Sequence, residues 1–219
     1  MSRTFYIVGV GMGAPDGLTG EARRVLDASD TVFATARLAA QAVAAGAQTA
    51  AVLVSGDVGF FSAAARLRGQ LAPHGTVQLV PGLSSLQYFC AKLGAPYDDV
   101  CVRSLHGRAG SILGAVSYHK RTFVLTGGAQ AAPIVCQTLA DADLGGLTVH
   151  LGENLGAADE RIETGAAAVL AGKPCGGLAV LLIEHPDAAN AREPVRDAML
   201  ARGDVPMTKE EVRWVSVSK

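Results

Sequence analysis

The chain has 219 residues, which is enough for one large domain or two small ones. Lys and Arg number 19 and Asp and Glu number 20, and this near balance argues against a binding surface for nucleic acid or an anionic membrane. With 49% hydrophobic and 18% charged residues, the chain is too apolar to be disordered and can bury a sizeable core. It has no apolar run typical of a signal peptide, and its four scattered cysteines predict reduced thiols in a cytoplasmic protein without a metal site.

Short apolar runs alternate with helical patterns through the first half of the chain. The pattern predicts strands at 5–10, 30–33, 50–54, 77–80 and 100–105, and helices at 60–71 and 84–93. The uncharged stretch 38–56 is long enough for a membrane span, but its Gln, Gly and Thr residues favour a helix, a turn and a strand. This alternation predicts an α/β domain with a largely parallel sheet.

A segment rich in glycine and polar residues, 107–114, is the best candidate linker, and the pattern resumes after it. The second half is predicted to hold strands at 122–126, 147–151 and 178–183, a helix at 133–140, and a charged hairpin-like stretch at 159–164. We therefore predict an N-terminal α/β domain over 1–107, a C-terminal α/β domain over 108–187 and a tail over 188–219. A capping box at 208–211 predicts a short helix in that tail.

The first glycine motif follows the first predicted strand. Gly9, Gly11 and Ala14 fit the GxGxxA fingerprint of dinucleotide-binding proteins. Two features count against that interpretation, because 15–17 separates the motif from the next helix and no acidic residue ends the second strand. A tight turn would need the same glycines, so the motif predicts only a loop lined by backbone that a ligand can approach closely.

Two further loops with glycine follow predicted strands. Ser55–Gly59 contains Asp57, which could anchor a ligand or, as is more usual, cap the following helix. Pro81–Ser85 combines a turn with Ser84 or Ser85 as the next helix cap. Because ligands bind at the carboxyl ends of strands in open α/β sheets, three such loops predict a common cleft.

The last two motifs also follow strands. His106 and Arg108 lie at the predicted domain junction, where an arginine could bind a substrate carboxylate. Gly152–Gly156, followed by acidic residues, comes after the strand at 147–151. No Walker loop, nucleophile elbow, HExxH motif or zinc spacing is present in the sequence, so we expect group transfer that depends on positioning.

These five motifs, in this order, resemble those of the tetrapyrrole (corrin and porphyrin) methylase family. The motifs at 8–19, 55–57 and 81–85 are features of the whole family. Those at 104–108 and 152–162 look like one branch, the precorrin-7 (C5)-methyltransferases, which form the C5-methylating part of precorrin-6Y methylase. The resemblance implies two α/β domains with S-adenosyl-L-methionine (SAM) in the cleft between them, and methylation of precorrin-7 or cobalt-precorrin-7 without decarboxylation, in cobalamin biosynthesis.

The resemblance also assigns site residues. It implies contacts to SAM, whose product is S-adenosyl-L-homocysteine (SAH), from both halves of the chain: Gly11, Gly56, Asp57, Gly59, Ser84, Ser85, Leu151, Gly152, Glu153, Ala179 and Val180. As catalytic residues we predict His106, as a proton carrier, and Arg108, which with Arg103 would anchor the acidic arms of the substrate. Relatives are usually homodimers, and a separate or fused domain performs C15 methylation and decarboxylation.

Three alternatives remain open from the sequence. The first is a tetrapyrrole methylase that acts at a different ring position. The second is a nicotinamide-dependent oxidoreductase that uses Gly9, Gly11 and Ala14. The third is a tetrapyrrole carrier that does not catalyse a reaction.

Overall fold

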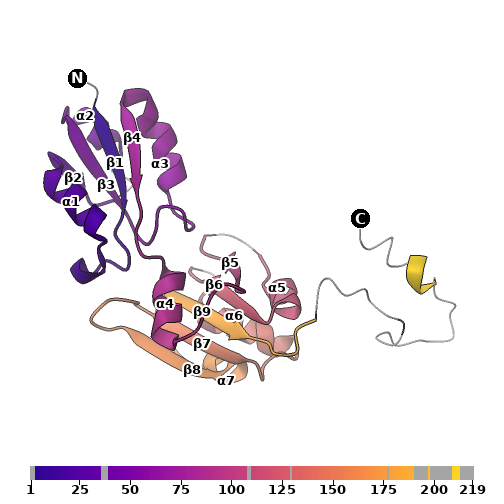
Figure 1. Ribbon diagram of the computed structural model, residues 1–219. Helices are drawn as coiled ribbons and strands as arrows, with labels where there is room; N and C mark the ends of the chain where they lie inside the picture. Colours follow the sequence, from indigo (N-terminus) through magenta and orange to yellow (C-terminus); the bar gives the residue numbers. More distant parts are fainter. Residues whose placement is uncertain are drawn as a thin grey trace.

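The computed structural model describes residues 3–35, 39–107, 110–128, 130–176, 178–189, 197 and 209–212. These residues form two β-sheets with helices on both faces, as Figure 1 shows. The first sheet has the strand order β2-β3-β1-β4 and the second β5-β6-β9-β7-β8. The predicted α/β class is therefore confirmed.

The first sheet is entirely parallel. Its strands are β1 (Thr4–Gly9), β2 (Thr31–Phe33), β3 (Thr49–Val54) and β4 (Thr76–Val80). Its helices are α1 (Gly20–Ala28), α2 (Ala39–Ala44) and α3 (Ala64–Leu71), with short 3-10 turns η1 (Pro15–Gly17) and η3 (Ala72–His74). Because all four strands run the same way, the loops after β1, β3 and β4 leave the sheet at one edge.

The helices cover both faces of this sheet. On one face, Ala22 of α1 packs on Val8 and Val80. On the other face, Leu67 of α3 packs on Ile7 and its neighbours. Burying these side chains stabilises the layers, at about 1.5–3 kcal/mol for each large apolar side chain.

The second sheet is mixed. Its strands are β5 (Cys101–Ser104), β6 (Arg121–Leu125), β7 (Thr148–Glu153), β8 (Arg161–Ala166) and β9 (Ala179–Glu184). Its helices are α4 (Ser85–Leu93), α5 (Leu113–Tyr118), α6 (Ala132–Asp141) and α7 (Ala167–Ala171). Strands β5 and β6 are parallel, whereas β9 is antiparallel to both β6 and β7, and β7 pairs with β8 as an antiparallel hairpin. The stretch 159–164, which we expected to form a hairpin by itself, instead supplies the first residues of β8.

The chain passes from the first sheet to the second between Val80 and Cys101 rather than after residue 107. Phe89 of α4 packs on Phe123 and Leu182 of the second sheet, and β5 pairs with β6. Helices α5, α6 and α7 cover the opposite face of that sheet. Helix α4 and strand β5 therefore belong with the second sheet, although we had expected them in the N-terminal domain. The boundaries of independently folding units stay a prediction.

One predicted helix begins later than expected. The apolar pattern predicted a helix from residue 60, but α3 begins at Ala64. Phe61 has a φ of 49°, in the left-handed region, and Phe60 turns away to pack near Phe123 of the second sheet, with 6.2 Å between the ring centroids. A non-glycine residue in the left-handed region interrupts a right-handed helix.

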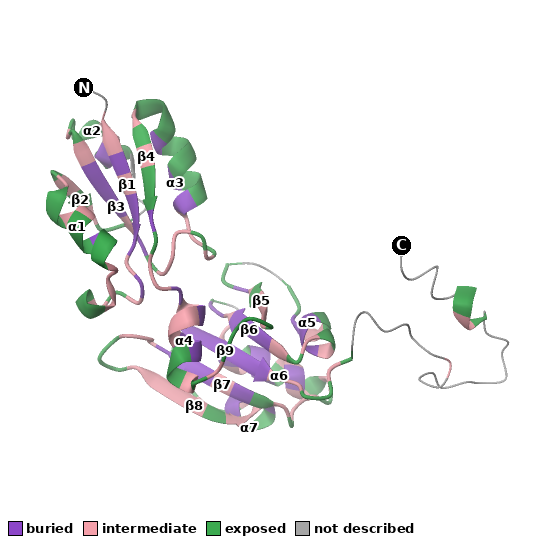
Figure 2. Cartoon of the chain, viewed as in Figure 1, coloured by how far each residue is buried: buried purple, intermediate pink, exposed green. Residues whose placement is uncertain are grey.

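Buried residues are concentrated on the strands at the centre of each sheet, as Figure 2 shows. The four cysteines are free, and burial raises the pKa of the Cys136 thiol to about 11. Across the described ranges, no helix has the length and apolar character needed to cross a membrane. Most of the predicted tail helix lies outside the described residues.

Candidate functional site

Two of the predicted glycine loops are joined directly by backbone hydrogen bonds. Gly11 N–H donates to the Gly56 carbonyl at 3.1 Å, and Gly56 N–H donates to the Gly11 carbonyl at 2.8 Å. Both glycines have positive φ, 62° and 70°, which a side chain would strain. The loops after β1 and β3 therefore form one unit at the carboxyl edge of the first sheet.

The third loop packs against the other two through backbone atoms. An ideal Cβ placed on Gly9 would lie 2.7 Å from Gly82 N and 2.8 Å from the Gly56 carbonyl oxygen. A Cβ on Gly82 would in turn lie 2.6 Å from the Gly9 carbonyl carbon. Only glycine permits this approach, so the predicted convergence of the three loops is present in the structure.

Asp57 fastens two of these loops together. Its carboxylate accepts hydrogen bonds from Gly59 N–H at 2.8 Å and from Gly82 N–H at 3.1 Å. Because α3 begins only at Ala64, Asp57 is not that helix's cap, which was the more usual interpretation of the sequence. A negative charge is thus held in the centre of the three loops.

Ser84 is the N-cap of α4, as one of the two options predicted. Its hydroxyl accepts from Gln87 N–H at 3.2 Å, and Gln87 Oε1 accepts from Ser84 N–H at 3.0 Å, which completes a capping box. Ser85 is the first residue of the helix. The Ser84 side chain therefore has a structural partner, and a contact to a cofactor from this loop stays a prediction.

The glycine loops leave space beside their backbone. An ideal Cβ at Gly56 or at Gly13 would meet no atom within 4 Å. Gly59 is also exposed, apart from the Asp57 carboxylate beside it. The loops therefore offer peptide groups and one carboxylate to an open side, which suits a flat ligand with a positive charge.

The residues of the second sheet that are predicted to contact SAM lie on two adjacent strands, β7 and β9. Gly152 lies opposite Val180, and Glu153 lies opposite Ala179. Gly152 faces α4, since an ideal Cβ there would lie 2.6 Å from a ring carbon of Phe89. Leu151 and Ala179 are buried in the core on the other face, so only their backbone could contact a ligand.

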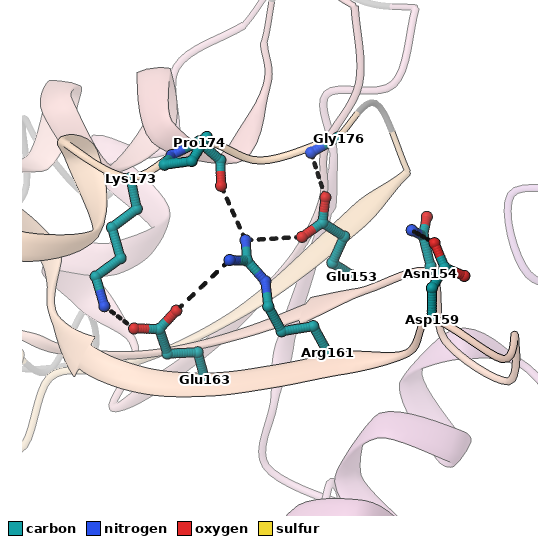
Figure 3. A network of polar contacts seen from close by, with 8 residues as sticks. All are labelled: Glu153, Asn154, Asp159, Arg161, Glu163, Lys173, Pro174 and Gly176. Atoms are coloured by element: carbon teal, nitrogen blue, oxygen red, sulfur yellow. Dashed lines mark hydrogen bonds and ion pairs between the residues drawn. The ribbon is translucent and has the colours of Figure 1, made fainter.

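The side chain of Glu153 is engaged in a polar network that the motifs did not predict (Figure 3). Glu153, 9% exposed, pairs with Arg161 at 2.7 Å and accepts a hydrogen bond from Gly176 N–H. Arg161 also approaches Glu163, which pairs with Lys173. Arg161 and Glu163 belong to β8, and the network holds the β7–β8 hairpin to the segment before β9. The Glu153 carboxylate is thus a structural group.

Of the two predicted catalytic residues, only His106 lies within the described residues. His106 is exposed, and its Nδ1 lies 3.3 Å from the carbonyl oxygen of Thr126. The Thr126 hydroxyl donates to the Ala179 carbonyl at 2.7 Å, so His106 lies at the same strand edge as the predicted Ala179 contact. Arg108 lies outside the described residues. Arg103 is exposed and donates to the Val102 carbonyl.

Contacts between the first glycine loop and the second sheet were also missed by sequence reasoning. Gly156, in the loop between β7 and β8, lies so close to Met12 that an ideal Cβ there would be 2.5 Å from Met12 Cβ. Glu160 in the same loop accepts hydrogen bonds from Tyr88 of α4 and from Gly156 N–H. The contact between Met12 and Gly156 joins residues so far apart along the chain that it leaves no local signal in the sequence.

Hydrogen bonds and burial shift the pKa values of Glu160 and Tyr88. Burial opposes the charged form of Glu160, but hydrogen bonds from Tyr88, Gly156 N–H and Lys92 outweigh it and lower the carboxyl pKa below its ordinary value. The pKa of Tyr88 is raised, first by its hydrogen bond to Glu160 and then by burial. Glu160 therefore carries its charge at neutral pH.

The structure bears on metal binding and on dinucleotide binding. Within the described residues, no group of three or more His, Cys, Asp or Glu side chains is placed to hold a metal ion. The dinucleotide fingerprint requires a helix that opens directly from the glycine loop, whereas η1 intervenes here and α1 begins only at Gly20.

Comparison with known proteins points to one group of enzymes. Two curated relatives, the cobalt-precorrin-7 C(5)-methyltransferases of Salmonella typhimurium strain LT2 and Salmonella typhi, are each 31% identical over 111 residues. The match covers 51% of this chain and 54% of each relative, so the chain spans about half the length of the curated relatives it matches.

Solved structures share the fold. Uroporphyrin-III C-methyltransferase of Thermus thermophilus, complexed with SAH, has a TM-score of 0.69 at 19% identity, over 84% of this chain and 98% of that chain. The precorrin-6Y methylase of Archaeoglobus fulgidus has a TM-score of 0.56 at 19% identity, with the same coverage.

The sequence profile of the tetrapyrrole (corrin/porphyrin) methylases matches residues 4–45 and 34–171, which include the three converging loops and the β7–β8 hairpin. With its two α/β sheets and its glycine loops in these positions, the chain belongs to the tetrapyrrole (corrin/porphyrin) methylase family.

Proposed function

We propose that this methylase transfers a methyl group from SAM to C5 of precorrin-7 or cobalt-precorrin-7 in cobalamin biosynthesis. The observation that carries the proposal is the convergence of the loops at Gly11, Gly56 and Gly82 around the Asp57 carboxylate, opposite the β7–β8 hairpin. The names of the Salmonella relatives favour C5 as the position, and the motif at 152–162 resembles the same branch.

The residues present fit SAM. The open side of Gly56 and Gly13 leaves room for a ligand against the backbone, and Asp57 supplies a negative charge near a sulfonium. Gly152 and Val180 would contribute backbone groups from the second sheet, because their side-chain positions face α4. When bound, SAM supplies a methyl group on a positively charged sulfur, and the electrons of the broken carbon–sulfur bond stay with the sulfur in SAH.

The protein's part in this chemistry is positioning. An already electrophilic methyl group does not require a strong nucleophile from the protein, so the loops need to align the reacting atoms and exclude water. We propose that Arg103 and Arg108 bind the acidic arms of the precorrin, because guanidinium groups pair well with carboxylates. We propose that His106, at the strand edge beside Thr126, accepts the proton released after transfer.

The partner proteins that the resemblance implies are part of the proposal. These are a second copy of the chain, in a homodimer, and a C15-methylating, decarboxylating domain that is separate or fused.

The test is to incubate the purified protein with carbon-labelled SAM and precorrin-7, and to follow the product by mass and by NMR. We expect the mass gain of one methyl group, with the label on C5. Transfer of the label to another ring carbon would instead support the alternative, a tetrapyrrole methylase that acts at a different ring position. Binding of SAM without any turnover would contradict the proposed enzymatic function.

A further inference from the structure

A carboxylate of the loop between β7 and β8 is hydrogen-bonded both to helix α4 and to the backbone of its own loop. Glu160 Oε2 accepts hydrogen bonds from Tyr88 Oη at 2.6 Å and from Gly156 N at 2.7 Å. Glu160 Oε1 lies 3.3 Å from Lys92 Nζ, and Lys92 in turn lies 5.2 Å from the centre of the Tyr88 ring. One side chain therefore joins α4 to the β7–β8 loop.

This connection extends to the loop after β1 through Gly156. The φ of Gly156 is 78°, a conformation that glycine adopts readily, and its backbone lies directly against Met12. Met12 immediately follows Gly11, which is hydrogen-bonded to Gly56. The position of Gly156 is thus set from one side by Glu160 and from the other by the glycine loops.

Helix α4 is a rigid support for this contact. It begins in the capping box of Ser84, directly after the loop that contains Gly82, and Phe89 anchors it in the core of the second sheet. Tyr88 and Lys92 are one helical turn apart, so both reach the same carboxylate. The side chain of Glu160 is 20% exposed, and hydrogen bonds to a charged group at such a site are stronger than neutral ones.

We propose that Tyr88, Lys92 and Glu160 form a clamp that positions Gly156 against Met12 and so sets the affinity of the protein for SAM and SAH. The inference rests on the proposed function, because it assigns positioning residues to the same cofactor site. None of the three side chains needs to touch the reacting atoms. They act by holding one wall of the site in place before the ligand arrives, which reduces the conformational entropy lost on binding.

The hairpin offers a matched control. Glu163 lies in β8, three residues beyond Glu160. It pairs with Lys173 and approaches Arg161 of the same strand, and neither residue belongs to the clamp. Glu163→Gln therefore removes a charge and an ion pair from the same hairpin, but it leaves the hydrogen bond between Glu160 and Gly156 in place. A difference between the Glu160→Gln and Glu163→Gln variants isolates the clamp from a general loosening of the hairpin.

The first measurement is calorimetric binding of SAH to the wild type, Tyr88→Phe, Glu160→Gln and the double variant. We expect Kd to rise about tenfold in Glu160→Gln and by a smaller factor in Tyr88→Phe, with the wild-type value retained in Glu163→Gln. The double variant should bind about as weakly as Glu160→Gln, because loss of the charge in Glu160→Gln already weakens the hydrogen bond that Tyr88→Phe removes. In turnover, KM for SAM should rise more than kcat falls.

The second measurement needs no ligand. Hydrogen exchange of peptides that cover 152–160 should be faster in Glu160→Gln than in the wild type, and unchanged in peptides from α6. Equal SAH affinity in Glu160→Gln and the wild type would overturn the clamp, even with a lower melting temperature. A wild-type protein that does not bind SAH would instead overturn the proposed function, and the exchange data would still show whether Glu160 holds the loop.

Discussion

At the scale of single residues, Asp57 has a structural role in the glycine loops, and we propose a role in binding for the same carboxylate. Its carboxylate accepts N–H groups from two different loops, so it fixes the distance between them. The backbone of the adjacent residue, Gly56, borders open space. A carboxylate that is held by the backbone in this way needs no reorganisation when a cation arrives.

We therefore expect Asp57→Ala to weaken SAH binding about tenfold or more, because it removes both the charge and the loop connection. Asp30→Ala is the control. The Asp30 carboxylate accepts Thr49 N–H at 2.8 Å at the opposite end of the same sheet, so its loss should lower the melting temperature with no change in Kd. Calorimetry and thermal unfolding of both variants check this. Equal Kd for Asp57→Ala and wild type would leave Asp57 with a structural role only.

Some residues of the site could be predicted from the sequence, and others could not. The glycine loops were predicted correctly because the need for a backbone without side chains can be read from their composition and their place after strands. The role of Glu153 was not predictable, because its partners Arg161 and Gly176 come from other segments of the chain. The contact of Met12 with Gly156 depends likewise on how the two sheets meet.

At the scale of elements, strands and caps were the most predictable features. The end of α4 at Gly94, in the left-handed conformation, and its start at Ser84 follow from local chemistry. The pairing of β5 with β6 could not be predicted in the same way, because the partner of a strand is not encoded in its own residues. The late start of α3 accompanies the left-handed conformation of Phe61 and the packing of Phe60 near Phe123, another distant contact.

Glycine in a loop and glycine in a helix should respond in opposite ways to the same substitution. Gly82→Ala places a Cβ against the backbone of Gly9, which cannot yield, so we expect a loss of stability of about 1–3 kcal/mol and a loss of SAH binding. Gly69 lies inside α3, where an added Cβ meets no atom within 4 Å, so Gly69→Ala should stabilise by about 0.5–1 kcal/mol. Denaturant unfolding measures both changes. A Gly82→Ala variant that is as stable as the wild type would contradict the close packing of the loops.

At the scale of the whole molecule, several contacts among the described residues connect the two sheets. Phe60 packs near Phe123, Met12 lies against Gly156, and α4 connects the loop after β4 to the face of the second sheet. Each of these contacts begins in one of the three converging loops or directly after it. A ligand bound in those loops would therefore touch the residues that also fix how the two sheets are oriented.

This arrangement predicts that SAH protects both sheets, and not only the one with the glycine loops. At a ligand concentration of 100 times Kd, binding stabilises the folded state by about 2.7 kcal/mol, which would raise the melting temperature of a chain of this size by about 5–10 °C. In hydrogen exchange, we expect slower exchange at 9–13, 56–59 and 81–84 and also at 152–156, because ligand and clamp would hold these segments together. Peptides from α6, on the far face of the second sheet, serve as the internal reference. Protection confined to the loops of the first sheet would show that the cofactor does not bridge the two.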